Sequence, residues 1–328
     1  MSRPRVLSGI RPTGAGFQLG NYVGAVRHWA QMQDQNECFY FIADLHALTE
    51  DPDPAQLRRR THESAAELLA MGIDPARSTL FVQSHLREHS ELAWILSCLT
   101  GFGEASRMTQ FKDKGGTGSN VGLFSYPVLQ AADILMYQAD AVPIGEDQRQ
   151  HLELTRDLAQ RFNRRYGETF RMPGQYVAKA GERIKDLQEP ARKMSKSIGG
   201  TGTLWVLDEP KVLVKKVKSA VTDTAREVRA ADDKPGITNL LTIFAAATGK
   251  AVEELEAAYA GKGYGDFKAD VAEAVVQLLE PVRARYAELV ADPGYLDQVL
   301  AEGAATARQV AVTTMTAVRE RVGLLAAP

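Results

Sequence analysis

The chain has 328 residues, of which 45% are hydrophobic and 24% charged, and its formal net charge is −2 at pH 7. This composition is typical of a globular protein, and the length predicts about two domains around a sizeable core. The charge shows no basic excess, so any nucleic-acid partner must be met by local patches. The sequence shows no signal-peptide apolar region and no apolar run near the roughly 20 residues of a membrane span, so we expect a cytoplasmic protein without membrane association.

The first half of the chain alternates between short apolar runs and helical patterns. We expect strands within residues 5–14, 38–49 and 78–85, and helices within residues 21–33, 53–73 and 89–102. Strand and helix alternate about every 30 to 40 residues, which predicts a parallel α/β sheet with crossover helices. Polar residues after such strands face a ligand crevice, and here they are the 8–14 turn, Asp44 with His46, and Gln83 with His85.

After about Arg183 the pattern changes to long helical segments within residues 207–221, 234–249 and 253–290, with no convincing strand. We therefore predict an α/β half followed by a helical half. The two cysteines, Cys38 and Cys98, lie in apolar stretches without metal-ligand spacing, so we expect reduced core residues.

The turn after the first strand, SGIRPTGAGFQLGNYVGA, contains five glycines. Glycine lets the backbone approach a ligand, and a helix starting near Gly20 and Asn21 would aim N–H groups at an anion. The segment matches neither a Walker loop nor G-x-G-x-x-G, so from these residues alone a plain glycine-rich turn is equally favoured.

Asp133 lies inside an apolar run, where an unpartnered carboxylate would cost several kcal/mol. It therefore needs a hydrogen-bond donor or a ligand, and backbone N–H donors are favoured from this fact alone. The turn PIGEDQRQH brings Glu146, Asp147, Gln148 and His151 together before a helix, an arrangement that helix capping alone could explain.

Several segments together carry a family resemblance. Lys193 to Ser197 reads KMSKS, and QLGN at Gln18 to Asn21 stands where class I aminoacyl-tRNA synthetases have their HIGH-type motif. Four further segments narrow the match to one family within this class. They are RMTQFKDK, YPVLQAADIL, VPIGEDQRQHLELTRDLAQRFN and AVTDT. From Ser8 to about Arg321 the chain resembles the bacterial tryptophanyl-tRNA synthetases.

The resemblance implies a Rossmann-like parallel-sheet catalytic domain in residues 1–190, a KMSKS loop in 191–200 and a helical, anticodon-binding domain in 201–328. Such enzymes join L-tryptophan to ATP, release pyrophosphate from the tryptophanyl-adenylate and transfer the acyl group to tRNA(Trp). The tryptophan carboxylate is already a nucleophile, so catalysis lies in alignment and in neutralising charge on the leaving pyrophosphate.

The same match implies roles for individual residues, with no protein metal ligands and with Mg²⁺ bound mainly through the ATP phosphates. The catalytic set is Lys112, Lys193, Ser195 and Lys196. The ATP-binding set is Arg11, Thr13, Gln18, Gly20, Asn21, Gly145, Asp147 and Met194. The tryptophan-binding set is His46, Tyr126, Gln130, Asp133 and Gln148, with Asp133 accepting the indole N–H.

For the macromolecular partners, the resemblance implies a homodimer and a tRNA that contacts the helical half. Lys211, Lys215 and Lys218 share one helix face, and Arg58 to Arg60 form a second basic group. Both groups are more often solvated faces than contacts.

The chain departs from the family pattern at several positions. Gln18 and Asn21 replace the two histidines of the HIGH-type motif, and the turn before them is one residue longer than the commonest form. Ile198-Gly199-Gly200 follows KMSKS in place of an acidic residue and a proline, and Gln130 stands where methionine is frequent. Two alternatives remain at this point: tyrosine specificity on the same fold, and a non-aminoacylating paralogue that binds tryptophan or a protein partner.

Overall fold

The computed structural model describes residues 3–14, 16–109, 111, 119–145, 148–176, 184–194 and 200–325. Its centre is a five-stranded sheet in the order β3–β2–β1–β4–β5, in which every neighbouring pair is parallel. The strands are β1 (Arg5–Ile10), β2 (Glu37–Ile42), β3 (Ser78–Val82), β4 (Ala141–Val142) and β5 (Gly174–Gln175). The predicted parallel α/β sheet is confirmed.

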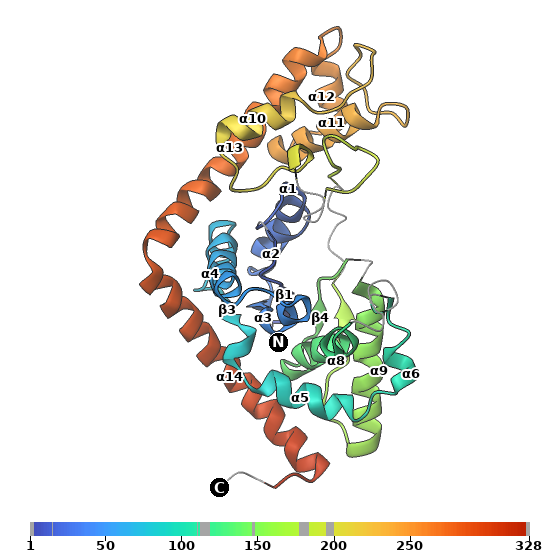
Figure 1. Ribbon diagram of the computed structural model, residues 1–328, viewed down its shortest axis with the longest axis vertical. Coiled ribbons are helices and arrows are strands. Elements are labelled where there is room, and N and C mark those ends of the chain that lie inside the picture. The colour runs from blue at the N-terminus through green and yellow to red at the C-terminus, as the bar shows by residue number, and fades with distance from the viewer. Residues whose placement is uncertain are drawn as a thin grey trace.

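Both faces of the sheet are buried, as expected for a parallel sheet covered by crossover helices. Along β2, Cys38, Tyr40 and Ile42 pack into one hydrophobic core, while Phe39 and Phe41 pack into the other. The helices of this half surround the sheet in Figure 1. They are α1 (Leu19–Asn21), α2 (Arg27–Met32), α3 (Asp44–Ala47), α4 (Pro54–Ala70), α5 (Glu88–Ser97), α6 (Phe102–Ala105), α8 (Val121–Met136) and α9 (Arg149–Tyr166).

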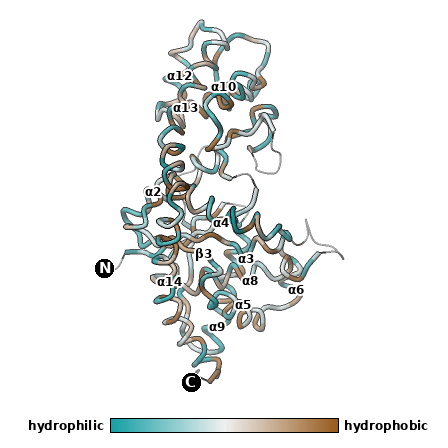
Figure 2. The backbone as a smooth tube through the Cα atoms, turned by 60° about the vertical axis from the view of Figure 1, so that its left-hand side comes forward, coloured by the Kyte–Doolittle hydropathy of each residue, from teal (hydrophilic) through white to brown (hydrophobic). Residues whose placement is uncertain are grey.

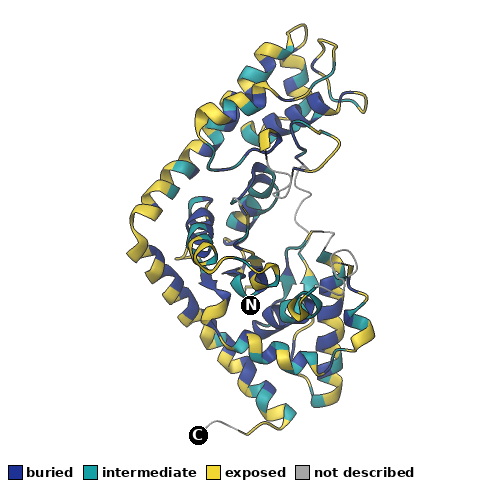
Figure 3. Ribbon diagram, viewed as in Figure 1, coloured by how far each residue is buried: buried dark blue, intermediate teal, exposed yellow. Residues whose placement is uncertain are grey.

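The rest of the described chain is helical, which confirms the second part of the fold prediction. Its helices are α10 (Pro210–Lys218), α11 (Pro235–Thr248), α12 (Val252–Ala258), α13 (Tyr264–Ala291) and α14 (Pro293–Val322). The two longest, α13 and α14, follow one another along one side of the molecule (Figure 1). Hydrophobic and hydrophilic residues alternate along them (Figure 2), and their outer faces are exposed while their inner faces are buried (Figure 3).

The C-terminal helix α14 covers the edge strand β3 of the sheet. At Gly303 the helix backbone comes so close to β3 that a Cβ atom would lie 1.8 Å from the Leu80 carbonyl oxygen. Arg319 of α14 also donates through Nε and Nη2 to the two carboxylate oxygens of Glu91 in α5. The helical half is therefore anchored to the sheet that carries the polar strand ends.

Several elements differ in detail from the sequence-based prediction. The strand within 38–49 ends at Ile42, and the chain then turns into α3, because Asp44 and His46 are held at the sheet edge. The helix within 21–33 begins with α1 and continues through a π-helical turn at Tyr22–Val26 before α2. β4 and β5 are too short, at two residues each, to leave a periodic pattern in the sequence.

The cysteine prediction is half wrong. Cys38 is buried in β2, but Cys98 is exposed where α5 ends. The helix C-terminus turns this side chain away from the core that receives Leu96. Apolar neighbours in the sequence do not by themselves fix which face of a helix end a residue takes.

Candidate active site

Asp133 is the centre of a buried polar cluster at the carboxyl ends of β2 and β3. Only 1% of Asp133 is exposed, and three side chains from other elements surround it. His46 Nε2 lies 2.8 Å from Oδ2, and His89 Nδ1 lies 2.6 Å from Oδ1. The Gln83 amide nitrogen spans both oxygens, at 2.8 and 2.9 Å. Because a carboxylate only accepts hydrogen bonds, both histidine nitrogens that face it carry protons.

The cluster keeps Asp133 ionised. Burial by itself raises the pKa of this carboxyl, but the hydrogen bonds from His46 and His89 outweigh burial and lower the pKa to about 2. On its far side, His89 Nε2 accepts a hydrogen bond from the Tyr137 hydroxyl at 3.0 Å. That bond fixes the His89 tautomer, so its other nitrogen donates to Asp133.

The sequence-based interpretation of these positions is partly corrected. Side chains, not the favoured backbone N–H groups, satisfy Asp133. His46 and Gln83 lie at the strand ends as predicted, but His85 is exposed and His89 takes the buried place. The sequence gives His89 no special signal, because it stands at the start of an ordinary amphipathic helix.

A second set of hydrogen-bonded polar side chains lies on the face of α8 that carries Asp133. Tyr126, Gln130 and Asp133 are spaced i, i+4 and i+7, which puts them on one side of the helix. The Tyr126 hydroxyl donates to His151 Nε2 at 3.0 Å, and His151 Nδ1 donates to the Gln148 amide oxygen at 2.8 Å. Burial raises the pKa of Tyr126 to about 12, so the phenol stays protonated and donates.

The ring of Tyr126 stands edge-on to both histidines, with centroids 6.0 Å from His46 and 5.4 Å from His151. The structure therefore brings His46, Tyr126, Asp133 and Gln148 of the predicted tryptophan set into connected contacts. His151, read from sequence as part of a capping turn, is the buried link between Tyr126 and Gln148. Gln130 is half-buried on the same helix face.

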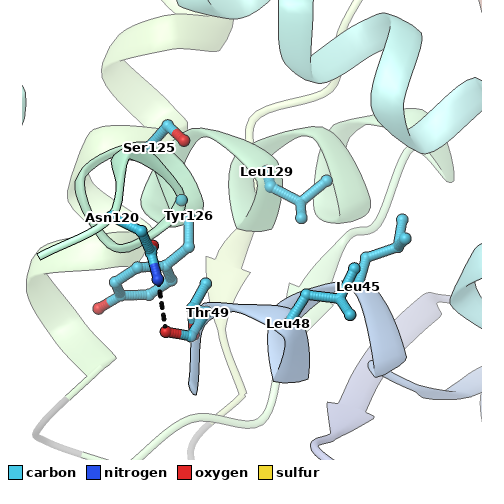
Figure 4. Close-up of a pocket in the computed structure, with 8 residues that line it drawn as sticks. Leu45, Leu48, Thr49, Asn120, Ser125, Tyr126 and Leu129 are labelled. Atoms are coloured by element: carbon cyan, nitrogen blue, oxygen red, sulfur yellow. Dashed lines mark hydrogen bonds between the residues drawn. The ribbon is translucent and has the colours of Figure 1, made fainter. Parts of the chain in front are cut away.

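A cavity of about 350 Å³ adjoins Tyr126 between the start of α8 and the segment that follows α3 (Figure 4). The Asn120 amide donates to the Thr49 carbonyl at 3.0 Å across this junction. Its lining residues are Leu45, Leu48, Thr49, Asn120, Gly122, Ser125, Tyr126 and Leu129. Tyr126 thus lies between this cavity and the polar cluster.

The predicted nucleotide residues gather at the start of α1. Gln18 caps this helix, since its side-chain oxygen accepts from the Gly20 N–H at 2.8 Å. Its amide nitrogen donates to the Met194 carbonyl at 2.7 Å, so Gln18, Gly20 and Met194 are joined directly. Asn21 completes the capping box. The Asn21 N–H donates to the Gln18 carbonyl at 2.9 Å and the Leu19 N–H to the Leu204 carbonyl at 2.8 Å, so the N–H groups of this helix start are engaged within the protein.

The remaining predicted site residues lie at the edges of the described structure. The exposed Arg11 guanidinium pairs with Glu50 at 2.7 Å, Thr13 lies in the following turn, and Gly145 and Lys193 are exposed. Lys112, Asp147, Ser195 and Lys196 lie outside the described residues. Within the described ranges, no group of three His, Cys, Asp or Glu side chains could hold a metal ion, and no helix is long and apolar enough to cross a membrane.

Replacing Asp133 with alanine is expected to lower the free energy of unfolding by about 3 kcal/mol, because three buried donors lose their acceptor. Urea denaturation followed by circular dichroism measures this loss. Asp157→Ala, on the exposed face of α9, is the matched control and should cost less than about 0.5 kcal/mol. Equal stability of the two variants would contradict the structural role of the cluster.

The chain was compared with known families and proteins. Residues 1–280 match the family model described as tRNA synthetases class I (W and Y). A curated relative, tryptophan–tRNA ligase 2 of Streptomyces avermitilis, is 58% identical over 99% of this chain and 98% of its own length.

Solved structures agree with the sequence matches. Tryptophanyl-tRNA synthetase of Mycoplasma pneumoniae superimposes with a TM-score of 0.88 at 37% identity, covering 98% of each chain. The Campylobacter jejuni enzyme, solved with ADP and tryptophan, gives a TM-score of 0.86 at 36% identity, covering 98% of this chain and 100% of that one. This chain therefore belongs to the class I tRNA synthetases for tryptophan and tyrosine, and within them to the bacterial tryptophanyl-tRNA synthetases.

Proposed function

We propose that the clustered residues around Asp133 and Gln18 carry out the two half-reactions of a tryptophan–tRNA ligase. The enzyme activates L-tryptophan with ATP to tryptophanyl-adenylate and pyrophosphate, then transfers the acyl group to tRNA(Trp). The observation that carries the amino-acid assignment is the buried, ionised Asp133, which needs no protonation change to accept an N–H group.

Tryptophan binds against the inner face of α8. The indole N–H donates to Asp133, and Gln83, which contacts both carboxylate oxygens, keeps one contact and yields the other. Tyr126 and Gln148 hold the amino and carboxylate groups of tryptophan. His151 is hydrogen-bonded to both side chains and so fixes their positions relative to each other. His46 and Gln130 form the wall of this pocket. A side chain without an N–H leaves Asp133 short of a donor, which disfavours phenylalanine strongly.

ATP binds across the start of α1. Gly20 and Asn21 lie against the nucleotide at the helix start, with the Met194 backbone beside the base. The lysines of the KMSKS segment and Lys112 neutralise the charge that develops on the leaving pyrophosphate, because lysine is a compact charge on a flexible stem. Mg²⁺ would be held mainly by the ATP phosphates and water, since this ion gives up its bound water reluctantly. The residues assigned to these roles are Arg11, Thr13, Gln18, Gly20, Asn21, Gly145, Asp147 and Met194 for ATP, with Lys112, Lys193, Ser195 and Lys196 at the phosphates.

The tRNA contacts the helical domain of residues 201–328. Lys211, Lys215 and Lys218 are exposed together on α10, which suits a phosphate backbone. Arg59 and Arg60 of the second basic group pair with Glu63, so they offer less free charge. Since tRNA charging takes place in the cytoplasm, we place the enzyme there.

The protein acts as a homodimer through an apolar surface on α5, α6 and α8. Trp94, Phe102 and Val121 are 71%, 79% and 79% exposed on these neighbouring helices. Large apolar side chains left exposed on neighbouring helices favour a protein interface. Trp94→Glu should shift the mass measured by analytical ultracentrifugation from dimer to monomer, and a wild-type monomer at micromolar concentration would contradict the proposal.

Tryptophan-dependent ATP–pyrophosphate exchange without tRNA tests the first half-reaction. We expect exchange with tryptophan and at least about 10⁴-fold less with phenylalanine, with tyrosine also inactive. Adding tRNA(Trp) and measuring acid-precipitable tryptophanyl-tRNA tests the second half-reaction. Folded protein that binds tryptophan without exchange would instead support the non-aminoacylating paralogue.

Lys196→Ala separates binding from catalysis. Removing one phosphate-neutralising charge should slow single-turnover adenylate formation by about 10²- to 10³-fold while leaving the tryptophan dissociation constant within about twofold. Lys250→Ala, an exposed lysine on the loop after α11, serves as the control and should leave both values unchanged. Equal losses in binding and rate would refute the assigned role of Lys196.

A further inference from the structure

An asparagine of the helical half holds the short stretch of chain that pairs with Lys193. Asn239 belongs to α11 and is 4% exposed. Its amide oxygen accepts a hydrogen bond from the Lys185 N–H at 2.8 Å, and its amide nitrogen donates to the Lys185 carbonyl at 3.0 Å. A single side chain from the helical half therefore engages both backbone groups of Lys185.

Lys185 lies directly opposite Lys193 in a short antiparallel pairing, where the two residues form an isolated β-bridge. Two backbone hydrogen bonds flank the bridge, and they run from the Asp186 N–H to the Arg192 carbonyl at 3.0 Å and from the Met194 N–H to the Ile184 carbonyl at 3.2 Å. In such a pair the N–H and C=O groups of Lys185 point away from Lys193, so they need partners on the other side. Asn239 supplies both partners, as a neighbouring strand would.

The same stretch of chain is fixed again two residues further on. The Leu187 N–H donates to the Gly202 carbonyl at 2.9 Å, and the Val221 N–H, in the AVTDT segment, donates to the Leu187 carbonyl at 2.8 Å. Residues 184–187 therefore bond to residues 192–194 and to Gly202, which lie on either side of positions 195–199 in the sequence. The place of the Lys193 backbone depends on this stretch.

The position of Asn239 requires a donor and an acceptor in one neutral side chain. Asparagine has an amide oxygen and an NH₂ group, whereas ionised aspartate only accepts hydrogen bonds and leucine offers neither group. The packing of α11 does not depend on the amide, because its Ile237, Leu240 and Leu241 are fully buried in a hydrophobic core. Loss of the amide is therefore expected to act on Lys185 and on the residue opposite it.

We propose that Asn239 is a positioning residue for Lys193. Through Lys185 it fixes the backbone from which the Lys193 side chain extends, so that the ammonium group reaches the polyphosphate from a fixed origin. Both ends of the Asn239 amide are bonded to Lys185, so Asn239 acts through that residue and not by touching ATP. This inference rests on the proposed function, in which Lys193 neutralises charge on the leaving pyrophosphate.

The expected effect is a loss of rate without a loss of tryptophan binding. A misplacement of about 1 Å at a group that orients a substrate costs up to about 10²-fold in rate. Asn239→Leu should therefore slow single-turnover adenylate formation by about tenfold. The dissociation constant of tryptophan should stay within about twofold, because the tryptophan site is built from other elements.

A double-mutant cycle between Asn239→Leu and Lys193→Ala tests the proposal, with single-turnover adenylate formation as the readout. If Asn239 acts through Lys193, the tenfold loss shrinks to less than about twofold in the Lys193→Ala background. A loss of equal size in both backgrounds would overturn the proposal, and so would a normal rate in Asn239→Leu. Asn239→Asp, which keeps the acceptor and loses the donor, is measured in the same cycle and decides the question if Asn239→Leu does not fold.

Asn36→Leu is the matched control. Asn36 is 7% exposed, and its amide nitrogen donates to the Met32 carbonyl at 2.9 Å, just before the amino end of β2. It should lower the melting temperature as Asn239→Leu does but leave adenylate formation unchanged. Equal rate losses in the two leucine variants would assign Asn239 to stability alone and overturn the proposal. Absent ATP–pyrophosphate exchange in wild type would refute the proposed function instead, so the two failures are distinguishable.

Discussion

The ionised carboxylate of Asp133 organises the α/β half of the molecule. A buried charge without partners would be expelled or neutralised, so the fold must bring donors to it from elsewhere. The donors come from α3, from the turn after β3 and from α5, while Asp133 itself belongs to α8. One side chain thus fixes the relative positions of four segments that are far apart in the sequence. Because of this side chain, the polar residues that follow β2 and β3 lie together at one end of the sheet.

The same cluster has a direct chemical consequence. Donors that hold Asp133 ionised also orient its oxygens, so under the proposed function the acceptor for the indole N–H is preorganised. Gln83 bridges both oxygens and can release one of them without leaving the carboxylate unpaired. His89 has no such freedom, since Tyr137 fixes its other nitrogen. Under the proposed function, structural stability and indole recognition are therefore coupled through Asp133.

Sequence patterns predicted the parts of the fold that depend on local periodicity. β1, β2 and β3 and the helical second half are present, and Asp133 was recognised as needing partners. The partners of Asp133 were harder to predict. His89 comes from a helix whose sequence pattern is ordinary and whose rotation about its axis depends on packing against α8. β4 and β5 have two residues each. β4 is defined by its pairing with β1 and β5 by its pairing with β4, and a local pattern contains neither pairing.

The predicted site residues divide in the same way, into those placed by the fold topology and those placed by long-range side-chain contacts. His46 and Gln83 follow strands directly, so topology alone brought them to the crevice, whereas His151 required the Tyr126 and Gln148 side chains to be placed in three dimensions. Family resemblance assigned roles to Gln18 and Asn21 but treated Gln18 as a departure from a histidine. Its two hydrogen bonds to Gly20 and Met194 depend on long-range contacts that the motif does not encode.

Charge is distributed unevenly between the two parts of the candidate site. At α8 the protein buries an ionised carboxylate, which under the proposed function accepts the indole N–H. At α1 the connection is made by the neutral Gln18 amide, and the N–H groups of Gly20 and Asn21 donate to Gln18 itself, so these residues add no charge. Under the proposed function, the charge that neutralises the phosphates therefore comes from the lysines, since Gln18 supplies none.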